Sequence, residues 1–260
     1  MGGTLSTARV GPVATVTMAR PEVHNAFNEH LIAELHAAFG ELASDPAIRV
    51  IVLAGEGKSF SVGADLDWMR RMGSASEEEN RADATKLAAM LRAVAECPKP
   101  VIARVHGNAL GGGAGLTAAA DIAIAAESAV FGFSEVRLGL APATIAPHVI
   151  EKIGAAHALP RFLTGERFDA ATAQRIGLVY RVVSDGKLDA AVDETVEALL
   201  AAGPAAQAAS KQLVRKIGDT PRSEIDAYTA ALIGSLRASD EGRDGVAAFL
   251  EKRKPRWMQS

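Results

Sequence analysis

The residues best able to do chemistry in this sequence lie between residues 101 and 140, and one of them is a carboxylate, Glu135. Four apolar residues surround Glu135 in the sequence: Phe131, Phe133, Val136 and Leu138. An acidic side chain in such surroundings loses hydration, so its pKa rises and it can exchange a proton near neutral pH. The local sequence leaves an equal alternative, in which Glu135 is a solvated carboxylate or an ion-pair partner of Arg137.

A run of three glycines precedes this carboxylate. Gly111, Gly112 and Gly113 open a small-residue helix that continues through Ala119. The unpaired N–H groups at such a helix start stabilise negative charge. No cation lies nearby, which favours an oxygen that becomes negative only during a reaction over a phosphate. The triplet also lacks the spacing of the two common nucleotide-binding motifs. A tight turn or close helix packing remains the plain alternative.

A second glycine-broken loop follows an apolar strand predicted over Ala47 to Ala54. Its residues Ser61 to Asp65 offer further backbone N–H groups at a strand end, with Lys58 beside them. The same loop could equally be an ordinary connection between a strand and a helix.

Hydrophobic periodicity predicts the elements that position these loops. Strands are expected over Gly11 to Met18, Ala47 to Ala54 and Val101 to Val105, with a helix from Asn28 to about Ser44. The strand, loop and helix unit recurs three times in the first 130 residues, which indicates an α/β stack. A last strand is expected near Leu178 to Val183, and from Leu188 to Lys252 the pattern is helical throughout.

Composition excludes several other classes of protein. The chain has 260 residues, 48% of them apolar, and a formal charge of -3, so it is globular and has no general field for nucleic acid or membranes. No apolar run approaches the roughly 18 residues of a membrane span, and the N-terminus does not resemble a signal peptide, so we expect a cytoplasmic protein. Cys97 is a lone core residue in this interpretation. His30 and His36 fall on opposite sides of a helix, and no metal site is expected.

Five segments, in order, give the chain a resemblance to the enoyl-CoA hydratase/isomerase (crotonase) superfamily over essentially its whole length. They are ARPEVHNAFN, FSVGADLDWM, the block from KPVIARVHGNALGGGAGL through DIAIAAESAVFGFSEVRLGL, LTGERFDAATAQRIGLV and GVAAFLEKRKP. The resemblance implies a core of stacked ββα turns over residues 1–187. It also implies a helical region over residues 188–260 that assembles trimers or hexamers.

The resemblance also implies a substrate and its contacts. The substrate would be an acyl-CoA, with coenzyme A as part of the substrate and no separate cofactor. Its thioester oxygen would accept hydrogen bonds from the backbone N–H groups of Ala64 and Gly112, and Glu135 would be the general acid or base. The implied substrate-binding positions are Val23, Asn25, Ala26, Ser61, Asp65, Leu66, Gly111, Gly115 and Ala143, joined by Phe249 and Lys252 of a neighbouring subunit.

One departure from the family pattern bears on the reaction. Typical hydratases of the family carry a first glutamate where this chain has Gly115, so Glu135 is the single acid or base. The segment FSEVRLGLAPATIAP is similar to that of bacterial methylglutaconyl-CoA hydratases, which favours hydration of a short or branched 2-enoyl-CoA. In that reading Glu135 acts alone, or a substrate carboxylate, Thr144 or His148 assists. The alternatives are a Δ3,Δ2-enoyl-CoA isomerase with one base and a catalytically silent acyl-CoA-binding homologue.

Overall fold

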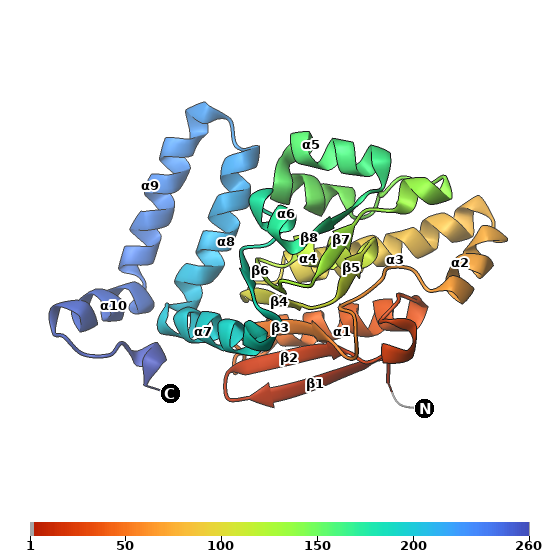
Figure 1. Cartoon of the computed structure of the whole chain (residues 1–260). Helices are drawn as coiled ribbons and strands as arrows, with labels where there is room; N and C mark the ends of the chain where they lie inside the picture. The colour runs from red at the N-terminus through yellow and green to blue at the C-terminus, as the bar shows by residue number, and fades with distance from the viewer. Residues whose placement is uncertain (1–2, 260) are drawn as a thin grey trace.

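A mostly parallel sheet, with β1 antiparallel at its edge, has helices on both faces and forms the body of the molecule, and a group of helices stands to one side of it (Figure 1). The computed structural model describes residues 3–259, so the outer ends of the two predicted regions, residues 1–2 and 260, lie outside the described residues. The strand order of the larger sheet is β1-β2-β3-β4-β6-β9. These strands are β1 (Leu5–Val10), β2 (Val13–Met18), β3 (Val50–Gly55), β4 (Val101–Val105), β6 (Ile122–Ala126) and β9 (Arg181–Val183).

A second, three-stranded sheet accompanies the first. It consists of β5 (Asn108–Leu110), β7 (Val130–Gly132) and β8 (Arg167–Asp169), in that order. After β4 and again after β6, the chain makes one short strand of this sheet and then a helical segment. After β3 the equivalent position is an isolated bridge between Ser61 and Ala109. The repeated ββα turn expected from the sequence is therefore present.

The helices complete the two layers. They are α1 (Glu29–Ser44), α2 (Leu66–Gly73), α3 (Glu77–Ala95), α4 (Gly112–Ala119), α5 (Ala146–Thr164, broken at Gly154), α6 (Ala170–Arg175), α7 (Leu188–Ala201), α8 (Pro204–Asp219), α9 (Arg222–Ala238) and α10 (Asp240–Leu250). Short 3-10 helices are η1 (Pro21–Val23), η2 (Glu135–Leu138), η3 (Asp185–Lys187) and η4 (Arg256–Met258).

Alternation along β3 explains why helices cover both faces of the sheet. Ile51 and Leu53 belong to the main core beneath α1, α3 and α4, whereas Val50 and Val52 pack with Val192 of α7 on the other face. A strand covered on both sides reads as a continuous apolar run, and β3 is such a run. No helix of residues 3–259 is long and apolar enough to cross a membrane.

Polar contacts attach the C-terminal helices to this body. The ammonium group of Lys211 in α8 lies 2.6 Å from the Asp121 carboxylate and donates to the Lys99 carbonyl at 2.9 Å. Arg49 donates to the carbonyls of Leu200 at 3.1 Å and Trp257 at 2.9 Å. These bonds tie the helical region to the ends of the sheet strands.

The structure corrects several element boundaries. β1, β5, β7 and β8 were not predicted, β3 begins at Val50 rather than Ala47, and β9 begins at Arg181 rather than Leu178. β3 begins later than expected because a turn precedes it, in which the Ile48 N–H donates to the Asp45 carbonyl. The helical C-terminal run is four helices, and its last one ends at Leu250. Glu135 is the first residue of the 3-10 helix η2.

Candidate active site

The first part of the site is the loop that carries Ala64. A bridge pairs Ala64 with Phe27: the Phe27 N–H donates to the Gly63 carbonyl at 2.6 Å, and the Asp65 N–H donates to the Phe27 carbonyl at 2.8 Å. Because both bonds come from the neighbours of Ala64, the Ala64 N–H points to the other side of the chain. Gly63 has a φ of +87°, a conformation that favours glycine.

Buried polar side chains fix this loop from behind. Asn25 is fully buried and donates to the carbonyls of Glu56 and Ser59 at 2.9 and 2.8 Å. The Ser61 hydroxyl donates to the Asn25 carbonyl at 2.8 Å and accepts from the Gly63 N–H at 3.4 Å. The side chains of Asn25 and Ser61 are thus committed to the loop, so any contact they make with a ligand is through their backbone.

An ion pair holds the loop on its other flank. The Arg20 guanidinium lies 2.9 Å from the Asp65 carboxylate, and the two side chains are only 14% and 12% exposed. Arg20 also donates to the Ala26 carbonyl. Asp65 in turn caps α2 by accepting from the N–H groups of Asp67 at 2.9 Å and Trp68 at 3.2 Å. Burial raises the pKa of Asp65, but the Arg20 side chain and these N–H groups outweigh it, so the pKa is lowered.

The glycine triplet forms the second part of the site, directly beside Gly63. A Cβ placed on Gly63 would lie 3.4 Å from the Gly112 backbone nitrogen, so the two loops are in contact. Gly111 has a φ of +50° and donates its N–H to the Gly132 carbonyl at 2.8 Å. Gly111 is the N-cap of α4, and Gly112 is the first residue of the helix. Within residues 3–259, the N–H groups of Ala64 and Gly112 donate to no protein acceptor.

The Glu135 carboxyl lies next to these amides. A Cβ placed on Gly111 would lie 3.3 Å from its Oε1 atom. Its Oε2 atom is buried and has no hydrogen-bond partner in the part of the chain that the structure describes. Burial raises the pKa of Glu135, and the hydrogen bond from its own N–H lowers it by less. A carboxyl that is partly dehydrated, has one oxygen without a partner and lies beside free amides is suited to proton transfer.

The space above Gly115 is filled by an aliphatic side chain that the sequence analysis did not single out. A Cβ on Gly115 would lie 2.4 Å from Cγ2 of Ile145 and 3.8 Å from Cδ2 of Leu91. Ile145 is 1% exposed. Ile145 and Gly115 are 30 positions apart in the sequence, and no local pattern indicates that they touch.

The two residues named as possible helpers differ from Glu135 in their surroundings. His148 on α5 has a pKa lowered by burial, and its charged neighbours are Glu151, Arg215, Glu96 and Arg92, which belong to α3, α5 and α8. Glu135 is not among them. Thr144 is half-buried at the start of the same segment.

The remaining predicted substrate-binding residues lie around the Ala64 loop, just before Ile145 and in the C-terminal region. Val23 is half-buried, Ala26 is buried and Leu66 is 74% exposed, all around the Ala64 loop, while Ala143 is exposed just before Ile145. Phe249, 83% exposed, and Lys252 belong to the C-terminal region. Figure 1 places α10 at the opposite side of the molecule from α2, so this chain does not bring these two residues to its own site.

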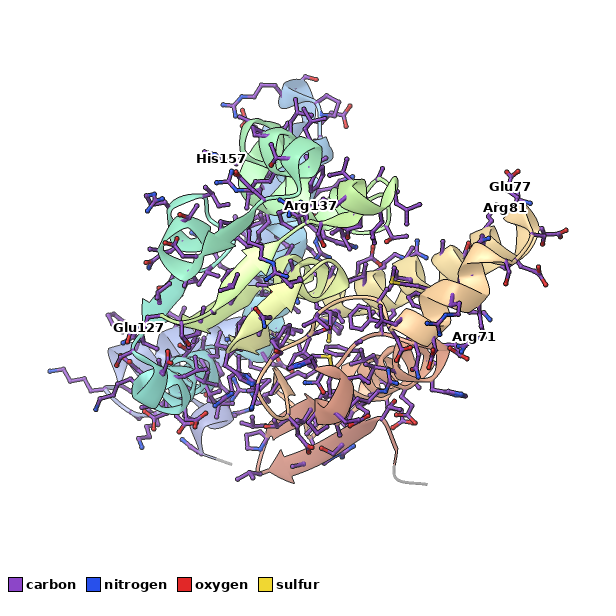
Figure 2. The ribbon with its side chains drawn as sticks, turned by 45° about the vertical axis from the view of Figure 1, so that its right-hand side comes forward. Arg71, Glu77, Arg81, Glu127, Arg137 and His157 are labelled. Atoms are coloured by element: carbon purple, nitrogen blue, oxygen red, sulfur yellow. The ribbon has the colours of Figure 1, made fainter. Side chains whose placement is uncertain are left out.

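The helices α2 and α3 form an arm that projects from the body. Figure 2 shows Arg71, Glu77 and Arg81 on this arm, well away from Arg137 beside α5. The arm is held to α1 by an ion pair between Arg71 and Glu29 at 2.7 Å. The start of α3 is closed by a reciprocal cap between Ser76 and Glu79.

Among residues 3–259, no group of three or more His, Cys, Asp or Glu side chains is placed to hold a metal ion. The chemistry that the site can offer rests on one carboxyl and two backbone donors.

The fold and the site define a class of proteins, and comparison with known proteins names it. The family model described as enoyl-CoA hydratase/isomerase matches residues 9–260. The short-chain-enoyl-CoA hydratase of Clostridium acetobutylicum is 32% identical over 246 residues, which cover 94% of this chain and 93% of that protein.

Solved structures agree. An enoyl-CoA hydratase from Shewanella pealeana superposes with a TM-score of 0.95 at 39% identity, covering 98% of this chain and 96% of that one. AtuE from Pseudomonas aeruginosa gives a TM-score of 0.95 at 34% identity, with 98% and 100% covered. The chain therefore belongs to the enoyl-CoA hydratase/isomerase family, an enzyme family that acts on acyl-CoA thioesters, as its sequence predicted.

Proposed function

We propose that this enzyme adds water to the double bond of a short or branched 2-enoyl-CoA, with 3-methylglutaconyl-CoA as the first substrate to test. The observation that carries the proposal is the Glu135 carboxyl, whose Oε2 atom is buried without a hydrogen-bond partner in the described residues, beside the free N–H groups of Ala64 and Gly112. The names of the relatives support the same activity, since several curated relatives are called enoyl-CoA hydratases.

The two amides act on the thioester oxygen. When water adds at C3, electrons move from the double bond towards the thioester, whose oxygen becomes negative. Donors fixed beforehand by Gly63 and by the start of α4 need no reorganisation to meet that charge, and the loss of either should cost about 3 kcal/mol in the transition state. Glu135 takes the proton from water and supplies one to C2. Burial raises the pKa of Glu135, which brings it closer to the neutral pH at which a general acid or base works best.

Coenzyme A is part of the substrate in this proposal, and no other cofactor is needed. Its path follows the backbone near Val23, Ala26 and Leu66, where an exposed apolar side chain lies beside the loop of Ala64. Phe249 and Lys252 would reach the nucleotide end from a neighbouring subunit of a trimer or hexamer. The exposure of Phe249 supports such a contact, because a large apolar side chain is stabilised when a partner covers it.

The test compares three substrates and two variants. Crotonyl-CoA, 3-methylglutaconyl-CoA and a 3-enoyl-CoA are supplied in turn, and absorbance of the conjugated thioester is followed. Glu135→Gln should lower the turnover of the preferred substrate by about 10²-fold to 10⁴-fold. Glu127→Gln, the same substitution at an exposed site (Figure 2), is the control and should match the wild type. If neither crotonyl-CoA nor 3-methylglutaconyl-CoA is hydrated, the proposal is refuted.

The second candidate is a Δ3,Δ2-enoyl-CoA isomerase. It is favoured by the presence of one carboxyl at the site, since moving one proton between C2 and C4 requires one base. In that case the 3-enoyl-CoA alone gains absorbance, and Glu135→Gln abolishes the gain. Binding of CoA thioesters without turnover of any of them, in the wild type and the variant alike, would identify a silent acyl-CoA-binding homologue.

A further inference from the structure

The packing above Gly115 has a consequence for the reaction. Gly111 and Gly115 are joined by a hydrogen bond from the Gly115 N–H to the Gly111 carbonyl at 2.9 Å, which places their Cα atoms about 6 Å apart. A Cβ on Gly111 would lie 3.3 Å from Oε1 of Glu135, and a Cβ on Gly115 would lie 2.4 Å from Cγ2 of Ile145. An acidic side chain at position 115 would therefore start one turn from the glycine that the Glu135 carboxyl contacts, and Ile145 occupies the volume of its first carbon.

The surroundings of that volume are apolar and close-packed. Ile145 and Leu91 are both buried, and the Cβ of Ile145 itself lies 2.9 Å from the Cβ position of residue 115. A rotation of the Ile145 side chain would move Cγ2 but not Cβ, so the conflict cannot be removed without a backbone shift. Neither side chain can hold a proton or orient a water molecule by hydrogen bonding.

We propose that Ile145 determines the specificity of the site for a one-carboxyl reaction, by closing the position next to Glu135 to any second acid. The inference rests on the proposed hydration and states how it proceeds. Glu135 as carboxylate accepts a proton from water while the water oxygen bonds to C3 and the double-bond electrons move to the thioester. The protonated Glu135 then gives that proton to C2, where the enolate electrons form the new C–H bond. The carboxylate is regenerated, and the net change is the addition of one water molecule.

A mechanism with one carboxyl has a distinctive dependence on pH. Only the ionised form of Glu135 starts the reaction, so kcat/KM should fall on the acid side through a single ionisation and show no fall on the alkaline side from a second acid. A pair of carboxyls, one ionised and one protonated, would instead give a bell-shaped profile.

The packing is tested by a thermodynamic cycle of Tm values that does not depend on activity. Gly115→Ala should lower Tm by about 5 °C, because the new methyl group overlaps Ile145. In the double variant Gly115→Ala/Ile145→Gly, which also removes the Cβ of residue 145, the methyl group enters vacated space, so Tm should be no lower than that of Ile145→Gly alone. A double variant whose Tm loss is the sum of the two single losses would overturn the proposed overlap.

The chemistry is tested with Gly115→Glu/Ile145→Gly, measured against Ile145→Gly as its matched control, because glycine also removes the Cβ of residue 145. The control should keep the one-sided pH profile of kcat/KM, and the double variant should gain an alkaline limb from the added carboxyl. A bell-shaped profile in the control, or an unchanged profile in a folded double variant, would refute the proposed role of Ile145. If the wild type hydrates no enoyl-CoA, the proposed function fails, and the Tm cycle alone then decides whether Ile145 closes the position.

Discussion

Removing the Asp65 carboxylate should show how the loop of Ala64 is held in place. Asp65→Ala deletes the cap of α2, in which Asp65 accepts from two backbone N–H groups at 2.9 and 3.2 Å. It also leaves the Arg20 guanidinium, 14% exposed, without the carboxylate that lies 2.9 Å away. The lost cap costs about 1 kcal/mol and the unpaired cation about 2 kcal/mol, about 3 kcal/mol in all. For a chain of this size, that lowers Tm by about 9 °C.

The same substitution should lower activity more than a distant change of equal stability cost. Ala64 immediately precedes Asp65, so a loosened loop displaces the Ala64 N–H, and a shift of about 1 Å in a catalytic group can cost about 100-fold in rate. The assay is kcat/KM with the preferred enoyl-CoA, measured well below the Tm of the variant. Asp67→Ala is the control, because the Asp67 side chain is exposed and pairs only with the exposed Arg70. It should leave Tm within about 2 °C of the wild type.

The pH dependence of this effect has a definite sign. The pKa of Asp65 is lowered in the folded protein, so its contribution to stability is present above the unfolded value of about 3.9 and is lost as pH falls through the folded value. The Tm difference between wild type and Asp65→Ala should therefore be constant from about pH 5 to 8 and close below about pH 4. A difference under 2 °C at pH 7, with kcat/KM unchanged, would show that Arg20 and Asp65 do not hold the loop.

Three further predictions concern the glycine triplet, the Glu135 carboxyl and the attachment of α8. Gly112→Ala puts a methyl group 2.5 Å from the Phe27 ring and should lower kcat/KM by about 10²-fold to 10³-fold, whereas Gly40→Ala, in open space on α1, should raise Tm by about 2 °C. Burial raises the pKa of Glu135 in the folded protein, so the stability that the Glu135 carboxyl contributes is lost as pH rises through this raised pKa. The Tm of Glu135→Gln should therefore increase relative to that of the wild type between about pH 4 and pH 8. Lys211→Met should speed proteolysis of α8, because the bonds to Asp121 and Lys99 are lost.

Long elements with regular periodicity could be predicted from the sequence. The helix expected from Asn28 to Ser44 is α1, with Asn28 as its cap, and the strand expected over Val101 to Val105 is β4. In both cases a buried face repeats at the period of the element, and a capping or glycine residue marks the end. The one-residue difference at the start of α1 reflects the cap itself, which is outside the helix.

Short strands could not be predicted in this way. β5, β7 and β8 contain three residues each, too few to display a period of two, and they exist because they pair with one another. β1 was missed for a different reason: all but its first residue are exposed, so no buried face marks it, and it forms by pairing with β2. Pairing partners distant in sequence decide such elements.

The parts of the site divide along the same line. Glycines before a helix and a carboxylate among phenylalanines are local features, and the sequence alone drew attention to both. The roles of Arg20 and Ile145 come from contacts across 45 and 30 positions, respectively. Arg20 shows no pattern that distinguishes it from a surface arginine, and Ile145 none that distinguishes it from a core isoleucine.

Most of this site depends on glycines, whose lack of a side chain allows the backbone segments to pack closely. A Cβ on Gly113 would lie 2.2 Å from the Ser61 carbonyl, and one on Gly112 would lie 2.5 Å from the Phe27 ring. Only glycines at these positions let the start of α4 approach the Ala64 loop closely enough for two free amides to share one space. Because the donors are backbone groups, substitutions in these loops alter their positions without changing their chemical nature. Glu135 carries a side chain beside them that can exchange a proton, so the identity of the reaction depends on what surrounds its carboxyl, and Ile145 packs on the Cβ position of Gly115, one turn along α4 from Gly111.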